Sequence, residues 1–476
     1  MGRRTAAAAG AAGPRGEHPF LRHPHRTLLA LSLPVLVSLV AEPLTGIADT
    51  AFVARLGATP LAALGAATAL LSALFWVFNF LGVGTQTAVA RSLGAGDGAG
   101  ARRALATALA TAAVLGAAVA LIAWPWLGGL AELLGASGDM RAAAVSYLEV
   151  RVLAAPAVLA TLAAFGALRG LHDMRTPLRI AVAINSLNVV LDAVLVLGLG
   201  PFPALGLRGA AWATAASQVL GALWAVAAAR GAVGGGAPLR ARAVRDLLVV
   251  GRELFLRTAL LLFFLALATR AATRLGSDVG AAHQALRSVW MLTAFVLDAY
   301  ATAAQSLVGS FVGAGAEPAA RRVASVASLW AAGTGAVLAL ALWAGEGWAR
   351  DLLVPVEAWG VLGGAWAVAA AAQPLSALSF VTDGIHWGAG DYRFLRNAMA
   401  LATAAGALAL ALELPPGAAG LERIWQITAG WIAVRAGLGL VRIWPGIDMA
   451  PLGAARLSGP RPRRDAGPGR FRGGLE

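Results

Sequence analysis

Two acidic residues lie inside the first long apolar stretch of the chain. The stretch begins near Thr27, and Glu42 and Asp49 occupy its later part, within EPLTGIADTAFVARLG, residues 42–57. A carboxylate at the centre of a membrane helix costs about 2.5–3.5 kcal/mol on insertion scales, so such a residue usually has a function. The two acids are seven positions apart, which places them on one helical face about two turns from each other.

A second polar stripe follows within the apolar run 178–199. Asn185, Asn188 and Asp192 are spaced 0, 3 and 7 and therefore share one face of a helix. If both stripes face the interior of a bundle, three carboxylates line one cavity. Apolar walls and like charges change how firmly a carboxyl group holds its proton, so these groups could load and release a proton. Alternatively, Asn188 and Asp192 only join helices through hydrogen bonds.

Further polar residues in apolar segments are candidates for lining a substrate cavity. They are Asn79, Gln86, Arg257, Arg270, Asp298, Gln305 and Asp383. Asp298 and Gln305 share a helical face. Asn79 and Gln86 occupy the equivalent positions in the first copy of the internal repeat described below. A buried Asp298 or Asp383 could instead pair with one of the two arginines, and such an ion pair inside a bundle is often structural.

Composition restricts the protein class. Of the 476 residues, 59% are hydrophobic and 13% charged, whereas soluble domains carry about 25% charged residues. The chain is therefore a polytopic membrane protein. The absence of cysteine excludes disulfides and thiolate chemistry. The absence of lysine excludes a Walker lysine and Schiff-base catalysis. We expect no metal site, no cofactor and no enzymatic activity.

The apolar runs predict an all-α protein with twelve membrane spans. The expected spans are 28–53, 64–90, 104–127, 142–168, 178–199, 208–229, 254–275, 285–311, 323–345, 358–387, 397–414 and 424–444. Several are longer than a membrane requires and contain proline, so we expect tilted or kinked helices at Pro34, Pro43, Pro156 and Pro374.

Arginines concentrate in the two tails and in every second loop. Examples are Arg91, Arg102, Arg103, Arg321 and Arg322, whereas the opposite loops are acidic. This alternation indicates a multi-pass protein of the plasma (inner) membrane with both termini in the cytoplasm. It also accounts for the net charge of +14 without a nucleic-acid partner. The expected partners are the lipid bilayer and a small-molecule substrate, and we expect a monomer.

The chain contains an internal repeat. A shift of 219 residues superimposes Gln86 on Gln305 and the arginine pair 102–103 on the pair 321–322, and a shift of 218 superimposes Asp173 on Asp391. Six spans per copy give both copies the same orientation, an arrangement found in transporters. The predicted units are a basic tail (1–26), a first six-helix lobe (27–230), a linker (231–250), a second lobe (251–445) and a second basic tail (446–476).

Long stretches of the chain resemble the multidrug and toxic compound extrusion (MATE) transporters. LPVLVSLVAEPLTGIADTAFVARLG resembles their first helix, and AFGALRGLHDMRTPLRIAVAINSLNVVLDAVLVLG resembles their fourth loop and fifth helix. FVLDAYATAAQSLVG and FVTDGIHWGAGDYRFLRNA are similar to helices 8 and 10 of the DinF-like branch. The similarity covers nearly the whole chain, in order.

The resemblance implies twelve helices in two bundles that form a V. It also implies export of amphipathic, often cationic, compounds by alternating access coupled to proton or sodium influx. The family's coupling residues map to Asp49, Asn188 and Asp192, and its bending proline maps to Pro43. Glu42 departs from the pattern, and no glutamate occupies helix 7, where Arg257 and Arg270 lie.

The two prolines of the first helix suggest how it could move. Pro34 and Pro43 leave backbone carbonyls unpaired and permit bending. Protonation of Asp49 or Asp192 would remove an inner charge, let this helix repack and expel a cationic substrate. The alternatives are a lipid-intermediate flippase or an organic-anion exporter, which Arg257 and Arg270 would suit. A membrane enzyme would need a cluster of polar catalytic residues, which the sequence does not contain. A channel is a further alternative, but duplicated halves favour alternating access.

Overall fold

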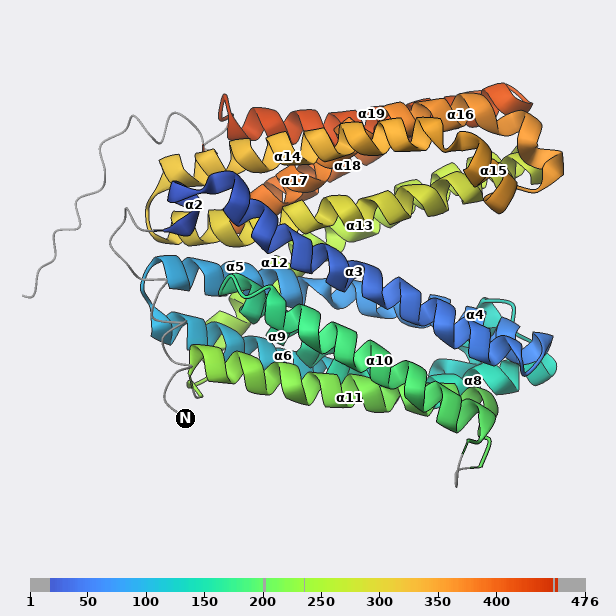
Figure 1. Ribbon diagram of the computed structural model, residues 1–476, viewed down its shortest axis with the longest axis horizontal. Helices are drawn as coiled ribbons and strands as arrows, with labels where there is room; N and C mark the ends of the chain where they lie inside the picture. Colours follow the sequence, from blue (N-terminus) through green and yellow to red (C-terminus); the bar gives the residue numbers. More distant parts are fainter. Residues whose placement is uncertain (1–17, 200–202, 235, 448–449, 453–476) are drawn as a thin grey trace, which may run out of the picture.

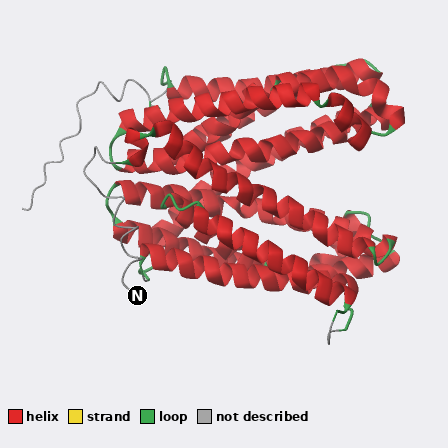
Figure 2. Cartoon of the chain, viewed as in Figure 1, coloured by secondary structure: helices red, strands yellow, loops and turns green. Residues whose placement is uncertain are grey.

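The computed structural model describes residues 18–199, 203–234, 236–447 and 450–452, and these residues form helices and loops without strands (Figure 2). In the first half the helices are α2 (Pro19–Arg22), α3 (Pro24–Ala54), α4 (Ala58–Trp76), η1 (Val77–Asn79), α5 (Phe80–Gly94), α6 (Gly98–Ala123), η2 (Trp124–Trp126), α7 (Leu127–Leu133), α8 (Gly138–Leu153), α9 (Ala155–Gly170), α10 (Arg175–Leu197) and α11 (Gly206–Val233). In the second half they are α12 (Ala241–Arg274), α13 (Ser277–Gly313), α14 (Glu317–Ala344), α15 (Glu346–Leu353), η3 (Val356–Ala358), α16 (Trp359–Ala371), α17 (Gln373–Ala389), α18 (Tyr392–Ala411) and α19 (Gly417–Ile443).

The membrane spans agree with the twelve predicted segments. Within the described residues, ten helices are long and apolar enough to cross a bilayer, and two bent helix pairs bring the total to twelve. The bent pairs, α8–α9 and α16–α17, turn by 48° and 46°. Pro156 and Pro374 lie in the first turn after each bend. Proline lacks an N–H and clashes with the preceding turn, which confirms the predicted kinks at these two positions.

The helices form two bundles that lie close together at one end and diverge toward the other (Figure 1). The close end carries the α5–α6 and α13–α14 loops with Arg102, Arg103, Arg321 and Arg322 nearby, and we call it the arginine-rich end. In lipid every backbone polar group must be paired within the protein, which is why helices cross the membrane. The predicted two-lobed helical architecture is therefore confirmed.

The first helix of each half crosses from one lobe to the other. At its start, α3 places Leu28 in a core cluster of second-half residues, and near its end Val53 lies in a first-half cluster. Helix α12 does the reverse, since Leu254 packs with Phe80 and Phe264 packs in the second-half core. The diagonal course of α3 is visible in Figure 1. The lobes are therefore linked by both crossing helices.

Helices α2 and α12 begin inside segments that were predicted to be a tail and a linker. Phe20, assigned to the basic tail, is completely buried on α2, because its ring packs among second-half residues next to Phe311. Helix α12 begins at Ala241, inside the predicted linker 231–250. Residues 1–17 and 453–476 of the predicted tails lie outside the described residues.

Candidate functional site

Two carboxyl groups face each other inside the first lobe. Asp49 comes from α3, and Asp192 comes from α10 and has no exposed surface. Their side chains are within hydrogen-bonding reach of each other, and no other described group donates to Asp192. A hydrogen bond between two carboxyl groups requires a proton on one of them. A proton on either group would therefore allow the two carboxyl groups to bond directly.

Asn188 connects this pair to the neighbouring helix. With its amide in the orientation that satisfies both polar atoms, Asn188 Nδ2 donates to Asp49 Oδ1 over 3.0 Å. Its oxygen then accepts from the backbone N–H and hydroxyl of Thr214 on α11, at 3.2 and 3.3 Å. Asn188 lies one turn before Asp192, so the predicted stripe on α10 does present both residues to Asp49. Asn188 thereby fixes the position of the Asp49 carboxyl group.

Arg151 on α8 is the positive charge of this site. It is 7% exposed, interacts electrostatically with Asp49, and donates through Nη1 to Gln218 Oε1 at 2.6 Å. Tyr147, one turn earlier on α8 and also buried, interacts electrostatically with Arg151. We call Asp49, Asn188, Asp192, Arg151 and Tyr147 the acid cluster.

Four residues of this site were not predicted from the sequence: Arg151, Tyr147, Thr214 and Gln218. The signal for Arg151 is present in the sequence, because it lies inside the predicted span 142–168, and an ionisable residue within a span is a functional-site candidate. The other three residues carry no such signal, since tyrosine, threonine and glutamine occur on many helix faces.

The remaining first-lobe candidates are not part of the acid cluster. Asn185 is partly buried, and Asn79 lies in the short helix η1; neither side chain makes a hydrogen bond within the described residues. The side chain of Glu42 lies outside the described residues. Helix α3 continues through both Pro34 and Pro43, so their role as hinges stays a prediction.

The second lobe contains a buried cluster of opposite polarity. Asp383 on α17 accepts hydrogen bonds from Arg257 on α12 and, at 3.0 Å, from Arg435 on α19. Each of the three residues is 6–7% exposed. The guanidinium carbon of Arg435 lies 4.5 Å from the ring centroid of Trp431, an arrangement that adds cation–π attraction. Of the ion pairs that the sequence left open, the one between Asp383 and Arg257 is present, and Arg435 is an additional partner.

Asp298 and Arg270 do not form the alternative ion pairs. Asp298 on α13 has no salt bridge within the described residues, and its electrostatic partners include Arg169 of the first half and Asp383. Arg270 is exposed near the end of α12 and has no acidic partner among the described residues. Arg257 and Arg270 therefore have different environments although they share a helix.

The two halves are sealed together toward the arginine-rich end. Gln86 on α5 donates through Nε2 to the carbonyl oxygen of Thr302 at 2.9 Å and to Ser306 Oγ at 2.8 Å. Ser306 Oγ in turn donates to the carbonyl oxygen of Arg169 at 2.8 Å. Gln86 is 3% exposed. It therefore lies in a closed contact between the lobes.

The same contacts recur in reverse, as the internal repeat requires. Gln305 donates through Nε2 to the carbonyl oxygen of Val83 and to Thr87 Oγ1, at 2.9 Å each. Thr87 Oγ1 donates to the carbonyl oxygen of Trp387 at 3.0 Å. Gln305 is 1% exposed. In this conformation both glutamines use their Nε2 donors across the lobe contact, and their role in lining a substrate cavity stays a prediction.

Small residues bring the helices close enough for these bonds. Gly94 of α5 lies against the backbone of Ser310, and Gly313 of α13 lies against the backbone of Arg91, so a Cβ atom at either glycine would overlap the opposite chain. His172, in the α9–α10 loop, also contacts the carbonyl oxygen of Ser306 at 3.3 Å. Burial lowers the pKa of His172 to about 4, so the imidazole is neutral at physiological pH. We call this set of contacts the closed gate.

We expect the two glutamines to determine how firmly the gate closes. Replacing both (Gln86→Met with Gln305→Met) removes four hydrogen bonds, each contributing about 0.5–1.5 kcal/mol, and should favour opening of the arginine-rich end. Because the chain has no cysteine, a Thr302→Cys probe can be labelled selectively. Its labelling rate should rise at least about tenfold, equivalent to ~1.4 kcal/mol.

The control for this experiment is Gln284→Met, which changes an exposed glutamine on the same helix α13. It should leave the labelling rate of Thr302→Cys unchanged. Equal labelling rates in the doubly substituted and unsubstituted chains would show that these glutamines do not hold the gate.

Comparison with known proteins identifies the family. The family model described as MatE matches residues 34–194 and 254–410. The chain belongs to the MATE family. It is 31% identical to DNA damage-inducible protein F of Escherichia coli, over 89% of this chain and 93% of that protein. It is also 31% identical to Protein DETOXIFICATION 44, chloroplastic, of Arabidopsis thaliana, over 87% of this chain and 81% of that protein.

Solved MATE structures have the same fold. A crystal structure of MATE in the bent conformation superimposes with a TM-score of 0.80 at 22% identity, covering 88% of this chain and 94% of that one. The predicted MATE resemblance, including its DinF-like character, is confirmed. The chain is therefore a membrane transporter of the MATE family.

Proposed function

We propose that this MATE protein exports amphipathic, cationic compounds across the plasma membrane in exchange for protons or sodium ions. The observation that carries the proposal is the close approach of the Asp49 and Asp192 carboxyl groups. With one shared proton the pair has a single negative charge, which Arg151 balances. Loss of that proton leaves one uncompensated negative charge in an apolar surrounding, and a cation can neutralise it.

This charge balance provides the coupling between substrate and ion. A proton and a cationic substrate can each neutralise the excess negative charge of the deprotonated pair. Binding of one therefore disfavours binding of the other. If substrate is released as the proton binds, the two move in opposite directions. Asp49 lies on α3, which contacts both lobes, so a change at the pair can reach the closed gate through this helix.

The orientation of the protein follows from its arginines. If the arginine-rich end faces the cytoplasm, the closed gate blocks the cytoplasmic side and this conformation is the one that releases substrate outside. Both termini then lie in the cytoplasm. The reciprocal conformation requires the contacts of Gln86 and Gln305 to break, as alternating access between repeats demands.

Transport by the full chain in proteoliposomes tests the function. Ethidium, an amphipathic cation, should move against an imposed pH gradient, and a sodium gradient of equal size identifies the alternative coupling ion. Liposomes without protein set the background. Movement at the background rate under both gradients would refute coupled export of cations.

A further inference from the structure

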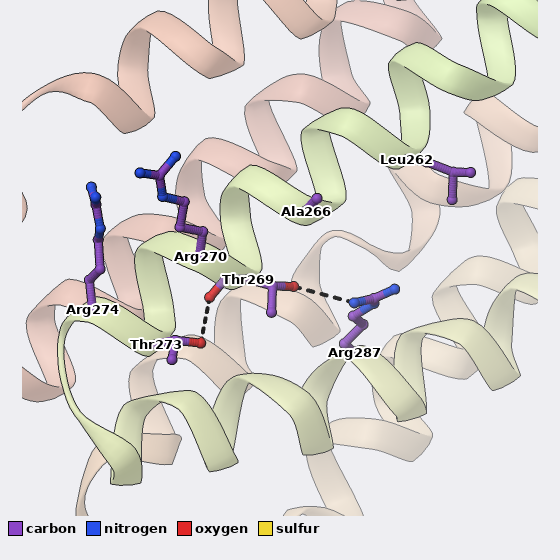
Figure 3. Close-up of a pocket in the computed structure, with 7 residues that line it drawn as sticks. All are labelled: Leu262, Ala266, Thr269, Arg270, Thr273, Arg274 and Arg287. Atoms are coloured by element: carbon purple, nitrogen blue, oxygen red, sulfur yellow. Dashed lines mark hydrogen bonds between the residues drawn. The ribbon is translucent and has the colours of Figure 1, made fainter. Parts of the chain in front are cut away.

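A cavity separate from the acid cluster is lined by residues of α12 and α13 (Figure 3). These residues lie in the last part of α12 and the first part of α13, at the opposite end of α13 from the gate. Its volume is about 530 Å³, within the size range of small-molecule sites. Its lining consists of Leu262, Ala266, Thr269, Arg270, Thr273, Arg274 and Arg287. Three of these seven residues are arginines, and none is acidic.

The three arginines are not neutralised by the protein. Arg287 Nη1 donates to Thr269 Oγ1 at 3.3 Å, and within the described residues Arg270, Arg274 and Arg287 take part in no salt bridge. By contrast, Arg257, which lies earlier on the same helix α12, forms an ion pair with Asp383. Guanidinium groups gathered without counter-charges attract anions, and their geometry matches carboxylate and phosphate groups. On α12, the arginine paired with Asp383 therefore differs from the two that line this cavity.

The cavity lies on the side of the second lobe that faces the first. Arg287 and Gln305 both belong to the continuous helix α13. They are eighteen positions apart, which equals five full helical turns and places them on one face. Gln305 contacts the first lobe from that face. Arg287 therefore lies on the face of α13 that is turned toward the first lobe.

We propose that this cavity binds the carboxylate or phosphate group of an amphipathic molecule. The guanidinium groups of Arg270 and Arg287 hold the anionic group, Arg274 adds a third positive charge at the mouth, and the apolar part lies against Leu262 and Ala266. The acid cluster attracts cations, so the two lobes present sites of opposite charge. The ligand is either a soluble organic anion or a zwitterion in transit, or an anionic phospholipid headgroup.

Carboxyfluorescein, an aromatic molecule with several carboxylates, is a suitable probe for the full chain in nanodiscs of phosphatidylcholine. Binding is measured by fluorescence anisotropy. Arg270→Gln with Arg287→Gln should weaken binding about 100-fold, because each charge-assisted hydrogen bond contributes about one factor of ten. Arg208→Gln changes an exposed arginine of the first lobe and should leave affinity unchanged, whereas Arg270→Lys with Arg287→Lys should retain part of it.

A second set of nanodiscs, containing phosphatidylglycerol, distinguishes the two sources of the anion. If lipid headgroups occupy the cavity, the probe binds more weakly to the unsubstituted chain in these discs. If a soluble anion is the ligand, affinity is the same in both kinds of disc. Equal affinity of the Arg→Gln chain and the unsubstituted chain in phosphatidylcholine would overturn the proposal. The measurement uses no ion gradient, so its result is independent of the proposed coupling.

Discussion

Asp49→Asn is expected to reduce gradient-driven export of ethidium to the level of protein-free liposomes while the protein stays folded. Asparagine preserves the shape of the side chain, and its oxygen can still accept from Asn188, whose amide lies 3.0 Å from Asp49. Its amide group can also donate to Asp192. In the variant the partner of Asp192 is always neutral, whereas the Asp49 carboxyl group can gain and lose a proton. The site therefore no longer alternates between two charge states.

The test of this expectation compares export rates and thermal unfolding in the same preparations. Asp139→Asn, which changes an exposed acid at the start of α8, is the matched control and should transport normally. Asp49→Glu keeps a titratable group and should retain part of the rate. Normal gradient-driven export by Asp49→Asn would refute the assignment of the carboxyl pair to ion coupling.

Asp383→Ala is expected to cause the largest loss of stability among single substitutions in the second lobe. Removing the carboxylate leaves Arg257 and Arg435 buried, at 7% and 6% exposure, without the group that both contact. Removing one partner of a buried ion pair typically costs 3–5 kcal/mol, because an uncompensated charge stays behind. We expect a loss of about that size in the free energy of unfolding, measured by denaturation in detergent.

An exposed ion pair of the same lobe provides the comparison. Asp351 pairs with Arg350 at 3.0 Å, and its side chain is 58% exposed. Asp351→Ala should therefore cost less than about 1 kcal/mol. If Asp383→Ala unfolds at the same denaturant concentration as Asp351→Ala, the buried cluster does not contribute to stability as proposed.

The amino-acid sequence by itself determined the spans, the repeat and the main acids. Spans could be located because about 20 apolar residues are needed to cross a bilayer, and the bends at Pro156 and Pro374 follow from the chemistry of proline. Asp49 and Asp192 stood out because an acid in an apolar run is rare. The repeat shift of 219 also paired Gln86 with Gln305, which make equivalent contacts in the structure. Each of these features depends on local chemistry or on the chain's similarity to itself.

Only the tertiary structure decided which side chains meet. In the folded protein Arg151 of α8 interacts with Asp49, and Asp383 forms an ion pair with Arg257. Arg270 lines a cavity. The tertiary structure also places Gln86 in the closed gate, whereas the sequence predicted a position in the substrate cavity. The physical reason is that lipid and neighbouring helices are equally apolar, so hydropathy does not reveal how a membrane helix is rotated. That rotation depends on close packing between helices distant in sequence.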